Sequence, residues 1–192
     1  MGHTYPPIII VSGAVGSGKG TVIHALAHEL GLEWVPTHTT RAHRPDDETL
    51  SRHVFDTEPT FLRHLARNEY LETIEYKGER YGLLREDLTQ ALKINKPVII
   101  ELSVEGGIKI ARQYPQVLLI FISTSEEFRT TVTRNQQSRK ADLKHSAGEK
   151  RKAFEHYDYI IENVEHYPNQ AIDAIKDIIT THFPELKKKG II

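Results

Sequence analysis

Residues 13–21 read GAVGSGKGT and follow the β-branched apolar run of residues 8–11, IIIV. A short run of this kind is typical of a strand buried on both faces of a parallel sheet. Beyond the glycines, apolar residues recur at helical spacing until Gly31, which favours a helix end. Because a strand, a glycine-rich turn and a helix form the context in which GxxxxGK[ST] binds phosphate, the stretch predicts a phosphate-binding loop.

Each part of this loop has a physical role in binding ATP. Inward-pointing backbone N–H groups and the positive end of the helix surround an anion, and glycines permit the close approach of phosphate oxygens. We expect Lys19 to place its ammonium group near the β- and γ-phosphates and to act in catalysis. The residues expected to bind ATP are Gly13, Ala14, Val15, Gly16, Ser17, Gly18, Lys19, Gly20 and Thr21.

The residue after the lysine departs from the pattern. Gly20 stands where a hydroxyl would ligate Mg²⁺, and the hydroxyl comes one residue later, at Thr21. We therefore expect no direct protein ligand to the metal. Mg²⁺ would arrive as MgATP, held by ATP oxygens and water, with Glu101 as the candidate outer-shell carboxylate. This arrangement suits phosphoryl transfer between small molecules better than a switch-type GTPase.

The composition excludes several classes of protein. With 192 residues, 39% hydrophobic and 27% charged, the chain predicts one soluble α/β domain. Its net charge of −1 argues against nucleic acid as a partner. The N-terminal stretch has neither a basic n-region nor an apolar run long enough for a bilayer, and cysteine is absent, so we expect a cytoplasmic protein without a membrane partner.

The rest of the chain alternates strand and helix patterns. Residues 96–103 and 116–123 repeat the buried-strand pattern, 157–163 is a further strand candidate, and 169–181 predicts a closing amphipathic helix. Alternating strands and helices imply a parallel sheet with right-handed crossovers. We therefore predict the three-layer α/β fold of P-loop NTPases, with a central parallel sheet.

Two segments interrupt this rhythm within the single predicted domain. Residues 37–81 are polar and mixed, with a helix expected over 57–68 and short strands near Val54 and Leu71, and predict a small inserted subdomain. Residues 135–152 are rich in Arg and Lys and predict a mobile basic flap. The predicted core comprises about 5–36, 82–133 and 153–183, with the insert at about 37–81 and a short lid at about 134–152.

A second anion site is indicated by THTTRAHRP, residues 37–45. Arg41 and Arg44 are three residues apart just beyond a predicted strand, and two guanidinium groups at that spacing can clamp one phosphate bidentately. The alternative is a pair of solvated surface arginines.

Five motifs in order resemble the guanylate kinase family over about residues 8–181. They are GAVGSGKGT (13–21), THTTRAHRP (37–45), EYLETIEYKGERYG (69–82), VIIELSVEGG (98–107) and YDYIIEN (157–163). The resemblance implies an ATP-dependent nucleoside monophosphate kinase that converts GMP or dGMP to the diphosphate. It implies that the insert at about 37–81 binds the monophosphate, with Arg41, Arg44 and Tyr81 on the acceptor phosphate. It further implies that Glu72 accepts hydrogen bonds from guanine N1–H and its amino group, and that Thr37 donates to guanine O6.

The chain also departs from the family at the acceptor site. His53 stands where the family has a tyrosine on the phosphate, Leu83 where it has a second hydroxyl for O6, and Ser103 where it has an aspartate. Glu101 keeps a carboxylate two residues before Ser103, on the same face of the strand. All four remain candidate acceptor-site residues, and base specificity is the weakest part of the assignment.

Cations from a closing lid complete the predicted mechanism, because phosphoryl transfer needs alignment and charge neutralisation. The candidates are Arg134, Arg139 and Arg151, although the lid motif matches poorly. His24 and His28 have a spacing that can serve one metal ion, but we favour a solvated helix face.

Two other functions stay open at this stage: a monophosphate kinase with different or relaxed base specificity, and a non-catalytic binding module. The oligomeric state also stays open.

Overall fold

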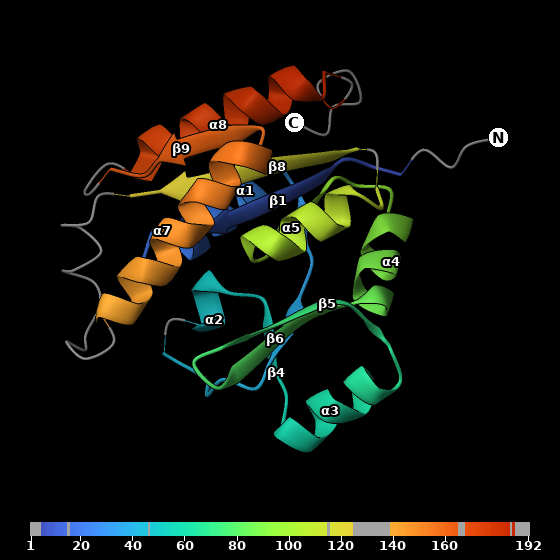
Figure 1. Cartoon of the computed structure of the whole chain (residues 1–192). Helices are drawn as coiled ribbons and strands as arrows, with labels where there is room; N and C mark the ends of the chain where they lie inside the picture. The colour runs from blue at the N-terminus through green and yellow to red at the C-terminus, as the bar shows by residue number, and fades with distance from the viewer. Residues whose placement is uncertain are drawn as a thin grey trace.

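The computed structural model describes residues 5–14, 16–45, 47–114, 116–124, 139–164, 168–184 and 186, with the backbone alone for 139–146. Val15 and Arg134 lie outside these ranges. A five-stranded parallel sheet forms the centre of the described structure (Figure 1). Its strands, in spatial order, are β2 (Glu33–Trp34), β7 (Val98–Glu101), β1 (Ile8–Gly13), β8 (Val117–Ser123) and β9 (Tyr159–Glu162). The predicted strands and their parallel pairing are confirmed.

Helices cover both faces of this sheet. Successive residues of a strand point to opposite sides, so the apolar strands need to bury side chains on both faces. Ile8 and Ile10 pack on one side with residues of α4 (Arg85–Lys93), α5 (Val104–Ala111) and α7 (Arg139–His156). Ile9 and Val11 pack on the other side with α1 (Lys19–Glu29) and α8 (Pro168–His182). The predicted three-layer fold is confirmed.

Residues 37–81 form most of a second sheet, which lies below the central one in Figure 1. Its order is β4 (His53–Phe55), β3 (Thr37–Thr39), β6 (Glu79–Leu84) and β5 (Tyr70–Tyr76). Helix α2 (Asp47–Leu50) and helix α3 (Glu58–Ala66) complete the segment. The Thr57 hydroxyl caps α3 by accepting the Thr60 N–H, so the helix begins close to where the sequence predicts it.

The basic segment is helical where it is described. Residues 139–156 form α7, which packs Ala153 into the core beside β8, whereas 135–138 lie outside the described residues. The sequence predicted a flap here because this segment has few large apolar residues. No helix in the described ranges combines the length and the apolar character that crossing a membrane requires.

Candidate active site

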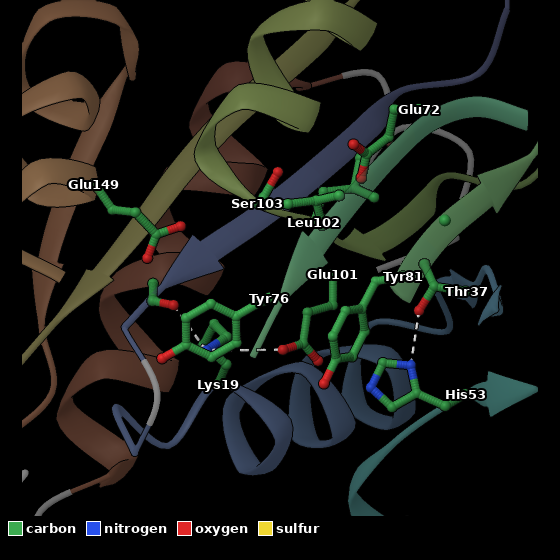
Figure 2. Close-up of a pocket in the computed structure, with 13 residues that line it drawn as sticks. Lys19, Thr37, His53, Glu72, Tyr76, Tyr81, Glu101, Leu102, Ser103 and Glu149 are labelled. Atoms are coloured by element: carbon green, nitrogen blue, oxygen red, sulfur yellow. Dashed lines mark hydrogen bonds and ion pairs between the residues drawn. The ribbon is translucent and has the colours of Figure 1, made fainter. Parts of the chain in front are cut away.

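A cavity of about 150 Å³ opens at the carboxyl ends of β1 and β7 and extends to the second sheet (Figure 2). In parallel α/β sheets this edge is where ligands bind. Residues of the phosphate-binding loop and of the predicted acceptor site line the cavity. The predicted site residues among them are Gly13, Lys19, Thr37, His53, Glu72, Tyr81, Glu101 and Ser103.

The phosphate-binding loop is held by an asparagine that sequence reasoning missed. The Asn163 side chain donates from Nδ2 to the Ser17 carbonyl oxygen at 2.9 Å. Gly18, at φ 77°, lies so close that a Cβ atom there would stand 2.5 Å from the same Nδ2. Asn163, which directly follows strand β9 of the same sheet, therefore supports the loop, and Gly18 leaves space for its side chain.

The departure at Gly20 has a packing explanation. A Cβ atom at this position would collide with the Leu50 carbonyl oxygen, because the end of α2 lies directly on the start of α1. The side chain of Thr21 is exposed. Position 20 thus cannot carry a metal-ligating hydroxyl unless the backbone of the insert moves.

Lys19 lies at the junction of the loop and the cavity. Its Nζ donates to the carbonyl oxygens of Gly13 at 2.8 Å and Ala14 at 2.9 Å, and it lies 3.8 Å from Glu101 Oε1. Figure 2 shows the lysine and Glu101 side by side. An ammonium group with a carboxylate next to it, at a glycine-rich loop, suits the phosphate chain of a nucleotide and its hydrated metal ion.

Glu72 is a buried carboxylate at the opposite end of the cavity. Its side chain is 6% exposed, and within the described chain its oxygens have no hydrogen-bond partner. Burial raises the pKa of Glu72 to about 7, with Lys109 opposing the shift and Glu105 adding to it. Gly106 makes this placement possible, because a Cβ atom there would stand 2.6 Å from the carboxylate.

Leu83 and Ser103 differ in their relation to the cavity. Leu83 pairs with Glu72 across β5 and β6 and is fully buried in the core, so it does not line the cavity. Its apolar side chain contributes to the low-dielectric surroundings of Glu72. Ser103 lines the cavity and caps α5 by accepting the Gly106 N–H at 3.0 Å.

Thr37 and His53 face each other from the paired strands β3 and β4. The Thr37 hydroxyl lies 2.9 Å from His53 Nδ1. Burial lowers the pKa of His53, and the positive charge of Arg41 lowers it further, while Glu101 opposes. The lowered pKa favours the neutral imidazole, and the hydrogen bond to Thr37 holds both groups beside the cavity.

The two arginines of the predicted phosphate clamp share one carboxylate, which sequence reasoning also missed. Arg41 is 6% exposed and donates from both terminal nitrogens to the two oxygens of Asp47 at 2.8 Å. Arg44 donates its backbone N–H to the same carboxylate at 2.6 Å, and its side chain is exposed. The alternative of a solvated surface arginine is thus wrong for Arg41. Neither arginine lines the cavity itself.

Helix α7, in the predicted lid segment, contributes an acidic residue to the cavity. Glu149 of α7 lines the cavity on the side of Lys19 (Figure 2). The side chain of Arg139 is not described, and Arg151 is exposed. Nothing in the basic sequence of this segment singled out its one cavity-facing glutamate.

Tyr157 and the adjacent glycines Gly106 and Gly107 pack against residues beside the cavity. The Ser12 hydroxyl donates to the Leu102 carbonyl oxygen at 2.7 Å and shares a 2.6 Å hydrogen bond with Tyr157. A Cβ atom at Gly107 would collide with the Tyr157 hydroxyl. One glycine of the pair accommodates the buried glutamate and the other accommodates this tyrosine. In the described ranges, no three His, Cys, Asp or Glu side chains are grouped to bind a metal ion.

Comparison with known proteins gives a consistent result. The family described as "Guanylate kinase" matches residues 5–182. Guanylate kinases from Halalkalibacterium halodurans and Bacillus subtilis are each 31% identical over 179 residues, which is 90% of this chain and 87% of theirs. The crystal structure of guanylate kinase from Anaplasma phagocytophilum superposes with a TM-score of 0.69 at 24% identity, over 92% of this chain and 86% of that chain, and shares the fold.

Proposed function

This chain belongs to the guanylate kinase family, and from that premise we propose that it transfers the γ-phosphoryl group of MgATP to GMP or dGMP. The transfer would be a direct in-line displacement, in which an acceptor phosphate oxygen forms the new bond to phosphorus as the bond to the ADP oxygen breaks.

The preference for guanine is supported mainly by the Glu72 carboxylate, which lines the cavity and has no hydrogen-bond partner among the described residues. Guanine presents two adjacent donors, N1–H and the 2-amino group, and an ionised carboxylate accepts from both. Adenine presents the unprotonated N1 as an acceptor at the same place, so its lone pair would face the carboxylate. Because Glu72 is buried, a base that leaves it unsatisfied is disfavoured more than in water.

We assign the other ends of the nucleotides from the phosphate-loop motif and from the family to which the chain belongs. The phosphate loop and Lys19 would hold the β- and γ-phosphates of ATP, and Lys19 would neutralise charge on the transferred group. Arg41, Arg44 and Tyr81 would bind the acceptor phosphate. Because an acceptor phosphate is already anionic at neutral pH, no strong general base is needed.

The residues beside Lys19 fit the magnesium ion that accompanies ATP. Glu101 supplies a carboxylate next to the ammonium group, and Mg²⁺ retains most of its water when phosphates and one or two carboxylates bind it. When bound, the ion would offset negative charge on the β- and γ-phosphates. Glu101 would bind its water shell, as no hydroxyl fits at position 20.

A coupled ADP-release assay with ATP and each of GMP, dGMP, IMP, AMP, CMP and UMP tests this function. We expect GMP and dGMP to be the best acceptors by at least about tenfold, the effect of one charged hydrogen bond. AMP or UMP at the same rate as GMP would contradict the assigned base. No transfer to any acceptor would contradict the kinase assignment and support a binding module.

A further inference from the structure

The acceptor side of the cavity contains a hydrogen bond between a tyrosine and a carboxylate of the same strand. The Tyr81 hydroxyl donates to Glu79 Oε2 at 2.9 Å, and both residues belong to β6, two positions apart and therefore on one face. Tyr81 lines the cavity, with its ring 6.1 Å from that of His53. Its single hydroxyl proton is thus already donated to a protein group.

Among the residues that the structure describes, no ion pair offsets the charge of Glu79. In the described part of the chain Glu79 has no cationic partner within ion-pair distance, and the Tyr81 hydroxyl is its hydrogen-bond partner. Its negative charge acts on Arg41, whose guanidinium group is held by Asp47. A phosphate that approaches Tyr81 therefore finds its hydroxyl proton already donated to the Glu79 carboxylate.

We propose that Glu79 sets the affinity for the acceptor, because it competes with the acceptor phosphate for the Tyr81 hydroxyl. The hydroxyl has one proton, so a phosphate oxygen and the Glu79 carboxylate cannot both accept it. This competition lowers the affinity for the monophosphate. The inference rests on the phosphate-binding role proposed for Tyr81.

Replacement of the carboxylate by an amide of the same shape tests the competition. In Glu79→Gln we expect the Kd for GMP, measured by calorimetry, and the KM for GMP to fall about three- to tenfold, the size of one hydrogen bond. The KM for ATP and the kcat should stay within about twofold. If Glu79 instead positions the hydroxyl for phosphate, the Kd and KM rise in this variant. A rise or no change overturns the proposal.

Glu75→Gln is the matched control. Glu75 lies on the neighbouring strand of the same hairpin, is exposed, and pairs with Arg80 at 3.1 Å. This variant removes the same formal charge without freeing Tyr81, so GMP affinity should not change. An equal gain in affinity in Glu75→Gln would mean that overall charge is responsible and would overturn the assigned role of Glu79.

Testing Glu79→Gln in a protein that already carries Tyr81→Phe separates this inference from the proposed function. Tyr81→Phe alone should raise the KM for GMP, and Glu79→Gln added to it should bring no further gain beyond about twofold. A gain that persists without the hydroxyl overturns the competition. An unchanged KM in Tyr81→Phe refutes the proposed role of Tyr81, whereas the kinase reaction itself is judged by the acceptor panel. Thermal unfolding of each variant confirms that it is folded.

Discussion

The backbone carbonyl group of Leu50 lies directly against Gly20, in the space that a side chain would need. Leu50 ends α2, and Gly20 is the second residue of α1, so this contact joins the insert to the phosphate-binding loop. The missing hydroxyl of the loop is therefore a consequence of packing. Any residue larger than glycine must push the insert away from the nucleotide site.

Gly20→Ser, which restores the usual hydroxyl, should destabilise the protein. Overpacking against backbone costs about 1–3 kcal/mol, and we expect a loss of that size in urea unfolding together with a lower kcat/KM. Gly148→Ala on α7 is the control, because a Cβ atom there meets nothing within 4 Å. Its stability should stay equal or rise by up to about 1 kcal/mol. A serine variant as stable and active as the parent would refute the packing explanation.

Lys19→Ala should remove phosphoryl transfer and leave the fold intact. The lysine contacts the loop only through two carbonyl oxygens and is not part of the core. Loss of one charge-stabilising donor typically lowers kcat by about 10²–10³-fold. The coupled assay and circular dichroism provide the measurement, with the exposed Lys93→Ala as the control. Retention of most activity would show that Lys19 does not face the transferred group.

Arg44→Ala should raise the KM for the acceptor and leave that for ATP nearly unchanged. The Arg44 side chain is exposed and makes its contact with Asp47 through the backbone, so the variant should fold normally. A weaker affinity for ATP instead would mean that the two nucleotide sites are assigned the wrong way round.

Arg41→Ala should also destabilise the fold, because it leaves the half-buried Asp47 with the Arg44 backbone N–H but without its ion-pair partner. Loss of hydrogen bonds between charged groups costs about 1.5–3 kcal/mol. Arg41 holds the pKa of Asp47 at about 2, below its ordinary value, so this stabilisation is present above about pH 4 and is lost as the pH falls towards 2. Urea unfolding at pH 7 and pH 3 measures it. An equal stability of Arg41→Ala and the parent at pH 7 would contradict the role of the pair.

Glu72→Gln should stabilise the protein at alkaline pH while it weakens GMP binding. The folded-state pKa of about 7 lies above the ordinary value of 4.5, so the folded state binds more protons than the unfolded chain. The free energy of unfolding of the parent therefore decreases as the pH rises from about 4.5 to 7, by up to about 3 kcal/mol. At pH 8 the amide variant should be more stable by about 1–3 kcal/mol, and near pH 4 the two should converge.

Urea unfolding at both pH values measures this difference, with the exposed Glu86→Gln as the control. A parent protein whose stability does not change between pH 5 and pH 8 would show that burial does not raise the pKa of Glu72.

The sequence was sufficient for the features that depend on local pattern. Apolar runs and glycines predicted the central strands and the phosphate-binding loop, and the order of motifs placed Glu72 and Lys19 at one site. What it could not provide are contacts between distant segments. Nothing in the sequence distinguished Asp47 from the other acidic residues, and only the fold shows that it accepts hydrogen bonds from Arg41 and Arg44.

The same limit explains the other differences. Leu83 was expected near the acceptor because of its place in the motif, but cross-strand pairing directs it into the core beside Glu72. Glu149 lies in a segment whose basic composition drew attention to its arginines. In the folded chain, α7 packs Ala153 into the core and presents Glu149 to the cavity, a rotation that the composition of the segment does not predict.

The ratio of kcat/KM for GMP to that for IMP tests the account most directly. IMP keeps O6 and N1–H and lacks only the 2-amino group, so it removes one of the two donors expected at Glu72. We predict a ratio of about 10–100 for the parent, the value of a hydrogen bond to a charged group, and a ratio near one for Glu72→Gln. Equal use of GMP and IMP by the parent, or an unchanged ratio in the variant, would show that Glu72 does not recognise guanine.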